Sequence, residues 1–436
     1  MYYFIGIKGT GMAALAGILH DIGNEVRGSD LATHFFTQDE LDRRNIVIDG
    51  FEDEVPSGCV VIIGNAFDDN FPQVKQALSN SSCTCYRYHE FVGVLMKKYL
   101  SISVAGSHGK TTTTTLLSTM LDFYRPTGYI IGDGTGKLTK DSELFVVESC
   151  EFRCHFLKYF PQYAIITNAD LDHVDYFKSH QQYYQAYEDF ALNVKDKIVL
   201  YGDDIPTREL KIDRSKCLYY GLDDSNDIVA KNLCEYPNHM TFDLYINKEF
   251  KFSFDLPLVG IHMLNNALAC IGIGYLLDMP FALMNEGLNH FKGAKRRYVI
   301  EEIGDCIYID DYAHHPTEVD MTIKATRKRF PGRKIVAIFK PHRASRVQSF
   351  VNEFAAALGQ ADVCAVCDFT SIDDFDDGSD ITIEYLTDRI EGCYVIHEND
   401  DDVKLLSAYK PCVYLFMSSK DIYHFANKIK EINGKS

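Results

Sequence analysis

A glycine turn near the start of the second quarter of the chain has the residue types that bind phosphate. It reads Gly106-Ser107-His108-Gly109-Lys110-Thr111-Thr112 and follows an apolar run over residues 101–105. Backbone N–H groups of such a loop, together with the positive end of a following helix, bind phosphate oxygens. The Lys110 ammonium would reach the outer phosphates of a nucleoside triphosphate, and the Thr111 hydroxyl would ligate Mg²⁺.

The loop is two residues shorter than the general GxxxxGK[ST] pattern. The alternative is an ordinary strand-to-helix turn, which the position between a strand and a helix disfavours. Five consecutive threonines starting at Thr111 are a poor helix interior by propensity, which fits a helix start selected for ligand binding.

A second glycine turn, at the start of the chain, satisfies the pattern G-x-G-x-x-A through Gly9, Gly11 and Ala14. Asp30 stands nineteen residues beyond Gly11, where an acidic residue can bind a ribose hydroxyl. This fingerprint predicts a bound pyrophosphate, and it suits NAD as well as any other nucleoside diphosphate.

Polar side chains also follow the next predicted strands. Glu148 comes after residues 144–147, and His173 follows a strand predicted over residues 163–167. Ligands in open α/β sheets bind at the carboxyl ends of strands. Glu148 and His173 could therefore complete a Mg²⁺ site with Thr111, and the neighbouring phosphate loop favours this role of the histidine over a structural one.

Two further groups have the chemistry of ligand binding. His262 and Asn266 stand four residues apart on one face of a helix predicted over residues 262–277. The amide could bind an adenine edge, or the pair could cap the helix. Arg343 and Arg346 follow another predicted strand, and their forked donors suit a carboxylate or phosphate ligand better than a purely surface role.

Apolar runs alternate with helix-length segments along the chain, which predicts an α/β protein with parallel sheets covered on both faces. The predicted strands cover residues 2–7, 25–28, 60–63, 101–105, 144–147, 163–167, 306–309, 335–339, 363–365 and 413–415. Because the pattern restarts twice, we divide the chain into three domains, residues 1–98, 99–293 and 294–436.

Composition excludes several classes of protein. The chain has 436 residues and a formal net charge of −18, which argues against a nucleic acid or an anionic membrane surface as partner. We see neither a signal peptide nor a segment of about 18 uninterrupted apolar residues, so we expect a cytoplasmic protein without stable membrane insertion. The 13 cysteines should then be reduced and mostly buried.

An acidic stretch at residues 373–378 is expected to be a solvated loop rather than a calcium site. The oligomeric state stays open between a monomer and a weak dimer.

A set of strings occurs together in one order along the chain. They are Gly6-Ile7-Lys8-Gly9-Thr10-Gly11-Met12, Gly28-Ser29-Asp30, the phosphate loop, Asp172-His173, Gly260…Asn266, Lys295-Arg296-Arg297, Asp310-Asp311-Tyr312-Ala313-His314-His315-Pro316 and Pro341-His342-Arg343. This set resembles the Mur ligases of peptidoglycan synthesis, from residue 1 to about residue 425. The resemblance implies a Rossmann-like N-terminal domain that binds a UDP-sugar, a central P-loop ATPase domain, and a Rossmann-like C-terminal domain that brings the amino acid. The first glycine turn would then bind uridine diphosphate rather than NAD.

The resemblance also implies ligands and the residues that bind them. The cofactors would be ATP and Mg²⁺, and the small-molecule substrates would be UDP-N-acetylmuramate and L-alanine, joined through an acyl phosphate on the lactyl carboxylate. ATP would contact the phosphate loop together with His262, Asn266, Arg297 and Asp311, and the metal would contact Thr111, Glu148 and His173. The UDP-sugar would contact Gly6, Gly9, Thr10, Gly11, Met12, Ser29 and Asp30. L-Alanine would contact Tyr312, His314, Arg343 and Arg346, and the catalytic groups would be Lys110, His314 and His342.

Three strings depart from the family pattern. Glu148-Ser149-Cys150-Glu151 stands where relatives carry an EADE-like string, so both glutamates are kept and the acid between them is missing. Met263 follows the matched histidine where an asparagine is common. The segment at residues 416–421 lacks the usual glycines, which leaves the role of that loop open.

Three alternatives remain on the sequence alone. A related ligase that attaches a recycled tripeptide to the same sugar nucleotide would share most of these motifs. An oxidoreductase would use NAD in the first glycine turn, but it would give the second phosphate loop no role. A nucleotide-binding scaffold without catalysis would have lost its catalytic groups, yet Lys110, Glu148 and His173 are all present.

Overall fold

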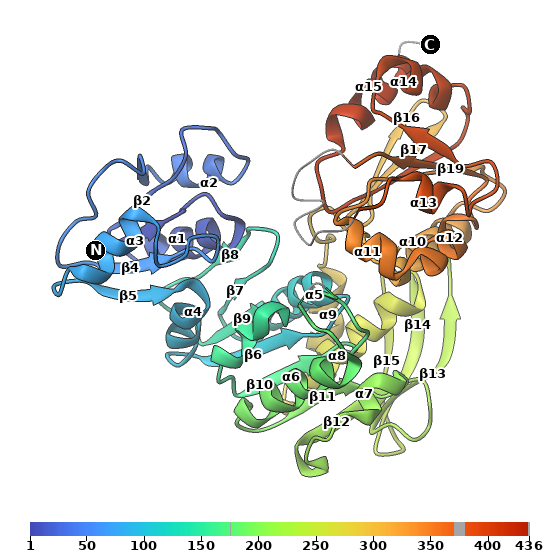
Figure 1. The fold of residues 1–436 in the computed structure, drawn as a ribbon. Coiled ribbons are helices and arrows are strands. Elements are labelled where there is room, and N and C mark those ends of the chain that lie inside the picture. Colours follow the sequence, from blue (N-terminus) through green and yellow to red (C-terminus); the bar gives the residue numbers. More distant parts are fainter. Residues whose placement is uncertain (175, 370–379, 435–436) are drawn as a thin grey trace.

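The computed structural model describes residues 1–174, 176–369 and 380–434. The described chain forms three β-sheets, each flanked by helices and each built from its own stretch of sequence (Figure 1). This arrangement confirms the predicted three-domain α/β fold. The acidic stretch at residues 373–378 lies outside the described residues. Within the described part, no helix is both long enough and apolar enough to cross a membrane.

The first sheet is entirely parallel, with the strand order β3-β2-β1-β4-β5. Its strands are β1 (Tyr2–Ile5), β2 (Val26–Ser29), β3 (Val47–Asp49), β4 (Val60–Ile63) and β5 (Thr84–Arg87). The helices of this part are α1 (Thr10–Asp21), α2 (Gln38–Arg43), α3 (Pro72–Ser79) and α4 (Tyr88–Met96). The strand order reverses between β1 and β4, and ligands of open parallel sheets bind at such a switch point.

The central sheet has ten strands in the order β15-β14-β13-β12-β11-β10-β6-β9-β7-β8. They are β6 (Leu100–Ala105), β7 (Thr127–Ile130), β8 (Gly136–Lys137), β9 (Leu144–Glu148), β10 (Tyr163–Ile166), β11 (Ile198–Tyr201), β12 (Cys217–Gly221), β13 (Ile228–Glu235), β14 (Met240–Ile246) and β15 (Glu249–Leu256). Strands β6 to β13 pair in parallel, apart from β8, which pairs antiparallel at one edge. At the other edge, β14 and β15 extend β13 as an antiparallel meander.

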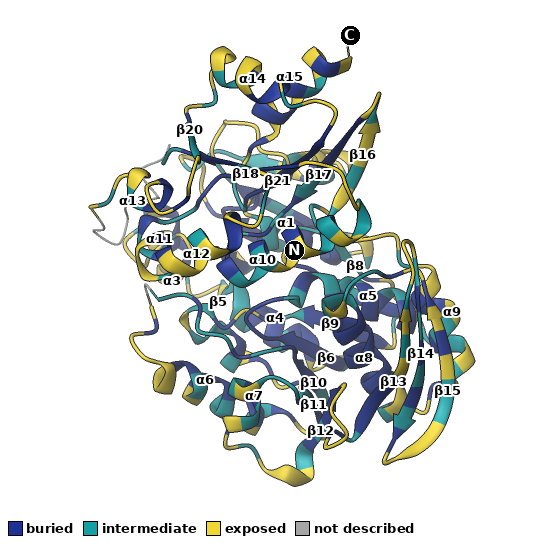
Figure 2. Cartoon of the chain, turned by 90° about the vertical axis from the view of Figure 1, so that its right-hand side faces the viewer, coloured by how far each residue is buried: buried dark blue, intermediate teal, exposed yellow. Residues whose placement is uncertain are grey.

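Helices cover the inner strands of this sheet. They are α5 (Lys110–Asp122), η1 (Phe152–Lys158), α6 (His180–Asn193), α7 (Ile205–Glu209), η2 (Arg214–Lys216), α8 (Ile261–Leu276) and α9 (Phe281–Asn289). Strands β6, β9 and β10 are buried almost throughout (Figure 2), as expected for parallel strands that are covered on both faces. Their carboxyl ends are adjacent, so the segments that follow them meet at one place.

The third sheet has the order β16-β17-β21-β18-β19-β20, and it is parallel except for the edge strand β16. Its strands are β16 (Val299–Ile303), β17 (Cys306–Asp311), β18 (Ile335–Phe339), β19 (Val363–Cys367), β20 (Tyr394–Ile396) and β21 (Val413–Met417). Its helices are α10 (Pro316–Arg329), α11 (Ala344–Ser349), α12 (Val351–Leu358), α13 (Glu384–Thr387), α14 (Asp400–Ser407) and α15 (Tyr423–Gly434). Successive residues of β17, such as Tyr308 and Ile309, point to opposite faces and enter separate apolar clusters, so this sheet has a core on each face.

Candidate active site

The phosphate loop joins β6 to α5 at the centre of the middle sheet. Gly106 and Gly109 have φ angles of +130° and +80°. A Cβ at Gly106 would collide with the Thr167 hydroxyl, and a Cβ at Gly109 would lie 3.0 Å from Asn266 Oδ1. Both positions therefore require glycine, and the absence of side chains there leaves the backbone of the loop open to a close ligand such as a phosphate group.

Lys110, the first residue of α5, is folded back onto the loop. Its Nζ donates to the carbonyl oxygen of Ser107 at 2.9 Å and lies 3.1 Å from Glu151 Oε2. Glu151 has no exposed surface. Burial lowers the pKa of Lys110, but Glu151, Cys150 and Glu148 together more than offset it, and the net effect raises the pKa above its usual value. The lysine is therefore held in its charged form beside the loop.

Glu148 is the last residue of β9 and faces the start of α5. The Thr111 hydroxyl donates to Glu148 Oε1 at 3.0 Å, and the Gly132 N–H donates to Oε2 at 2.7 Å. Burial raises the pKa of the Glu148 carboxyl, and the charges of Lys110 and Arg297 only partly oppose this effect. A half-buried carboxylate next to a hydroxyl is the oxygen donor set that Mg²⁺ prefers, so these two residues fit the ion.

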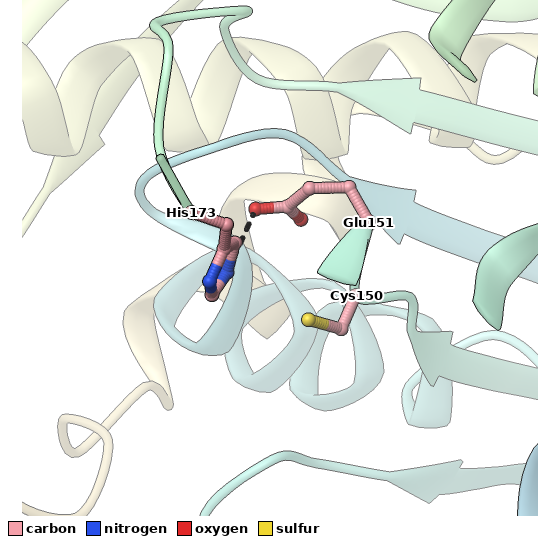
Figure 3. A group of neighbouring side chains, drawn as sticks. All are labelled: Cys150, Glu151 and His173. Carbon is pink, nitrogen blue, oxygen red and sulfur yellow. Dashed lines mark ion pairs between the residues drawn. The ribbon is translucent and has the colours of Figure 1, made fainter. Parts of the chain in front are cut away.

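Three side chains of different chemistry converge beside this pair (Figure 3). Cys150 and Glu151 follow β9, and His173 comes from the loop after β10. The His173 Nε2 lies 3.4 Å from Glu151 Oε1. Burial lowers the pKa of His173, but Asp172, Cys150 and Glu151 outweigh it and raise the pKa to about 10. The predicted metal ligand His173 is thus paired with Glu151 in this structure.

Two cavities adjoin the phosphate loop. The first, which we call the helix cavity, has a volume of about 530 Å³ and is lined by residues of the loop, of α8 and of α10. The second, which we call the shared cavity, has a volume of about 940 Å³. All three domains contribute to its lining, through Thr10, Lys110, Glu148, His173, Tyr312 and His314. His108 and Thr112 face the helix cavity, Ser107 and Thr111 face the shared cavity, and Gly109 lines both.

His262 and Asn266, near the start of α8, both line the helix cavity. Burial lowers the pKa of the His262 imidazole to about 4, so its ring is neutral near pH 7. Asn266 lies beside Gly109 of the phosphate loop. The structure therefore brings the predicted adenine-binding pair next to the predicted phosphate site.

Glu318 of α10 links the third domain to the phosphate loop. Its Oε1 lies 3.5 Å from His108 Nδ1 and 3.7 Å from Arg297 Nη1, and its Oε2 lies 3.1 Å from His314 Nδ1. Burial raises the pKa of the Glu318 carboxyl, but the two histidines more than offset this and hold it well below its usual range. Glu318 was not predicted as a site residue, although it stands three residues after His315 at the start of α10, where a capping glutamate is common.

Arg297 stands in the connection between the second and third domains, and Asp311 is the last residue of β17. Arg297 Nη2 donates to the Thr111 hydroxyl at 3.4 Å, and its guanidinium lies over the Tyr312 ring at 4.7 Å. The Asp311 carboxylate accepts the Tyr298 N–H at 2.8 Å and the Ala313 N–H at 2.7 Å. Burial raises the pKa of Asp311 to about 6. Both predicted ATP contacts line the helix cavity, and the carboxylate of Asp311 also holds the backbone around them.

Arg346, which is predicted to bind the carboxylate of L-alanine, is paired with Asp172 in this structure. Its Nη2 lies 2.9 Å from Asp172 Oδ1, and both side chains are buried. Burial raises the pKa of Asp172, but the positive charges of Arg346 and His173 hold it well below its usual range. This guanidinium is thus bound to the loop that carries His173.

Arg343 and His342 stand just before α11. The Arg343 guanidinium lies 6.0 Å from the centre of the Phe152 ring, and that ring packs on His173 at 4.8 Å. The His342 Nδ1 lies 3.2 Å from the Ser419 hydroxyl. Burial lowers the pKa of His342 to about 4. Tyr312 and His314 line the shared cavity on the same side of the third sheet.

In the first domain, the predicted sugar-nucleotide residues gather around the end of β1. Gly6 has a φ of +82°, and a Cβ there would collide with Phe67. Gly9 precedes α1, whose first three residues are Thr10, Gly11 and the buried Met12.

The polar residues predicted at this turn are already engaged within the protein. Asp30 accepts the Lys8 N–H at 2.7 Å and the Leu31 N–H at 2.8 Å. Ser29 is buried and donates to Gln73 Oε1 at 2.5 Å. The Asp30 carboxylate therefore braces the glycine turn itself.

Comparison with known proteins matches all three domains to one family. Residues 1–100 match the model "Mur ligase family, catalytic domain", residues 104–274 match "Mur ligase middle domain", and residues 295–416 match "Mur ligase, glutamate ligase domain". Among solved structures, the UDP-N-acetylmuramate-alanine ligase MurC from Thermotoga maritima is similar with 25% identity and a TM-score of 0.79, over 100% of this chain and 99% of that one.

Two other ligases share the fold. The murein peptide ligase mpl from Psychrobacter arcticus has 22% identity and a TM-score of 0.70, over 100% of this chain and 99% of that one. The MurF ligase from Thermotoga maritima, solved in complex with ADP, has 17% identity and a TM-score of 0.66, over 95% and 96%. With all three domain models matched in order along the chain, the protein belongs to the Mur ligase family of ATP-dependent ligases that make peptidoglycan precursors.

Proposed function

We propose that the protein joins L-alanine to the lactyl carboxylate of UDP-N-acetylmuramate, with ATP as the source of phosphoryl groups. The observation that carries this proposal is the shared cavity, to which the glycine turn, the phosphate loop and the third domain each contribute. A reaction that joins a sugar-bound acid to an amino acid at the expense of ATP needs three ligands at one place. The full-length likeness to an alanine ligase at 25% identity supports L-alanine as the third.

The chemistry begins with a carboxylate, which resists attack by an amine because it is already negative and lacks a leaving group. Transfer of the ATP γ-phosphoryl group to this carboxylate forms an acyl phosphate, which supplies the leaving group. Lys110 would leave the Glu151 carboxylate to neutralise negative charge that develops on the transferred group. The amine of L-alanine then attacks the acyl carbon, and phosphate departs from the tetrahedral intermediate.

Thr111 and Glu148 would hold Mg²⁺, with His173 as a further ligand or as a neighbour that orients one. When bound, the ion supplies positive charge to the phosphate oxygens. Arg297 adds a second positive group at the same point, because its guanidinium contacts the Thr111 hydroxyl from the third-domain side. Docking of the third domain would thus complete the charge around the transferred phosphoryl group.

The incoming amine must lose a proton as the amide bond forms. His314 lines the shared cavity, and its Nδ1 lies between Glu318 and the carbonyl oxygen of Tyr312, at 3.1 and 3.0 Å. The opposite nitrogen, Nε2, could then face the amine and take its proton. Arg343 would bind the alanine carboxylate, and His342 would support this loop through Ser419.

The main alternative within the family is attachment of a recycled tripeptide to the same sugar nucleotide. Because the family consists of ATP-dependent ligases, membership in it excludes the oxidoreductase alternative. Release of phosphate from ATP tests the proposal, with UDP-N-acetylmuramate and each amino acid or peptide supplied in turn. We expect release to require the sugar nucleotide and L-alanine together. Release that needs the tripeptide instead would overturn the assignment of the amino acid while keeping the reaction class.

A further inference from the structure

The cluster of Cys150, Glu151 and His173 contains a thiol, a carboxylate and an imidazole, and the reaction proposed above uses no thiol. The donor atoms of the three side chains all lie within 4.8 Å of one another. We propose that they form a binding site for a thiophilic divalent cation such as Zn²⁺, separate from the oxygen pair of Thr111 and Glu148. Bound there, the cation would inhibit the enzyme.

The geometry suits a tetrahedral ion. With metal–ligand bonds of about 2.0–2.3 Å, the donor atoms of a tetrahedral zinc site stand roughly 3.3–3.7 Å apart. The His173 Nε2 and Glu151 Oε1 are already 3.4 Å apart. The sulfur has to approach by about 1.5 Å at most, which a rotation of the exposed Cys150 side chain about χ1 can supply.

Two of the three ligands are held in place before any ion binds. His173 has a φ of +51°, a conformation that few non-glycine residues adopt, and its ring packs against Phe152 at 4.8 Å. Its neighbour Asp172 is anchored by the buried ion pair with Arg346. Glu151 is fully buried and points toward the imidazole (Figure 3). Preorganised donors of this kind lower the cost of binding a metal.

The donor set selects the type of ion. Thiolate and imidazole favour Zn²⁺ over Mg²⁺, whereas Thr111 and Glu148 offer only oxygen. Cys150 and His173 both line the shared cavity, which gives the ion a path of entry and leaves room for a fourth ligand. Both Cys150 and His173 bind a metal only in their deprotonated forms, so binding releases their protons to solvent and the affinity should rise with pH.

The expected consequence is inhibition, and only this part rests on the proposed function. Glu151 is the partner of Lys110, and a cation on the carboxylate would compete with the lysine ammonium for its charge. The cation would also occupy His173 and the space beside the phosphate loop. Transfer of a phosphoryl group should therefore slow down when the site is filled.

Cobalt titration of the full-length protein tests the site directly, because Co²⁺ takes the place of Zn²⁺ and reports its ligands by absorption. We expect one Co²⁺ per chain with a thiolate-to-cobalt charge-transfer band, and displacement of the cobalt by Zn²⁺. Cys150→Asp and Cys150→Ser should lose the band and bind at least about tenfold more weakly, since each removes the soft ligand. Cys154→Ser is the matched control, because it removes a neighbouring thiol outside the cluster, and it should keep the band.

A band of unchanged intensity in both Cys150 variants would place the metal on another thiol and overturn the proposal, as would a wild-type protein that shows no band. Melting temperatures without metal identify a variant that fails to fold. In the phosphate-release assay, each protein is compared with its own rate without zinc. The zinc concentration for half-inhibition should rise about tenfold or more in Cys150→Ser and stay unchanged in Cys154→Ser. Equal inhibition of both variants would refute the inhibitory role. A protein that binds cobalt through Cys150 but releases no phosphate with any substrate would refute the proposed function alone.

Discussion

Asp172 and Arg346 form a buried ion pair of 2.9 Å between the loop that follows β10 and the start of α11. One partner belongs to the ATPase part of the chain and the other to the third domain. Because Asp172 precedes His173, the pair joins the position of the third domain to the geometry of the phosphate site.

Removal of one partner should disturb this docking. Arg346→Met removes the buried ion-pair partner of Asp172, a change that costs about 3–5 kcal/mol when the structure cannot relax. Because Asp172 without its partner favours an arrangement in which water reaches its carboxylate, we expect the loss to appear as a lower kcat/KM for all three substrates. Steady-state kinetics of Arg346→Met, Asp172→Asn and the double variant measure the effect. The double variant should be no slower than the slower single variant, and fully additive losses would show that the pair does not act as a unit.

Arg343 should act differently from Arg346. We expect Arg343→Lys to raise the KM for L-alanine strongly, because a lysine cannot reproduce the two parallel bonds of a guanidinium to a carboxylate. The KM values for ATP and the UDP-sugar should change little. Kinetics with each substrate varied in turn provide the check. A rise confined to the KM for ATP would instead assign Arg343 to the γ-phosphate.

Lys110→Ala should lower the rate of acyl-phosphate formation by a factor on the order of 10²–10³, because it removes one group that stabilises charge in the transition state. Binding of the UDP-sugar should persist, since the glycine turn belongs to another sheet. The exposed Lys98 offers a matched control, and Lys98→Ala should keep the wild-type rate. Turnover of Lys110→Ala at the wild-type rate would be incompatible with the proposed ATP site.

Glu148→Gln should raise the Mg²⁺ concentration needed for half-maximal activity at fixed ATP. The amide keeps the size of the side chain but loses the negative charge that Mg²⁺ prefers. Glu143, exposed just before β9, provides the control, and Glu143→Gln should leave the Mg²⁺ titration unchanged. Identical titrations for the two variants would remove Glu148 from the metal site.

His315 should make the protein less stable in mild acid. Burial lowers the pKa of its imidazole to about 2, with a further contribution from His108. The folded state therefore stays neutral while the unfolded chain takes up a proton near pH 6.5, so stability falls as the pH drops below that value. Between pH 7.5 and 5 this group alone should cost about 2 kcal/mol. His315→Asn keeps a capping acceptor for α10 and should flatten the pH dependence of urea unfolding, and an equally steep dependence in the variant would contradict the assignment.

Much of this fold follows from local sequence pattern. The inner parallel strands are apolar runs followed by glycine or polar residues, and the predicted strand at 335–339 coincides with β18. The antiparallel strands β13 to β15 were not predicted, although buried and less buried residues alternate along β14 from Met240 to Ile246. The threonines of α5 form a helix despite low propensity. The hydroxyls of Thr114 and Thr115 bond to the carbonyl oxygens of Lys110 and Thr111, each at 2.8 Å.

The candidate site was harder to predict wherever a contact crosses between domains. The phosphate loop and Glu148 lie close in space because neighbouring parallel strands place them there. The role of Glu318 depends on how α10 docks against the phosphate loop, and local sequence carries no signal for that docking. The position of Arg346 after β18 predicts that it binds a substrate. The ion pair that it forms with Asp172, which lies 174 residues earlier, could not be predicted from local sequence.

Competition between two acceptor substrates distinguishes an alanine ligase from a tripeptide ligase. The enzyme is supplied with ATP, Mg²⁺ and UDP-N-acetylmuramate, and with equal concentrations of L-alanine and the recycled tripeptide. Mass spectrometry then identifies the nucleotide product. We predict UDP-N-acetylmuramoyl-L-alanine as the dominant product, formed together with one ADP and one phosphate. The assignment of L-alanine as the acceptor would be contradicted if the tripeptide adduct accumulated. It would also be contradicted if ATP were consumed and no adduct formed.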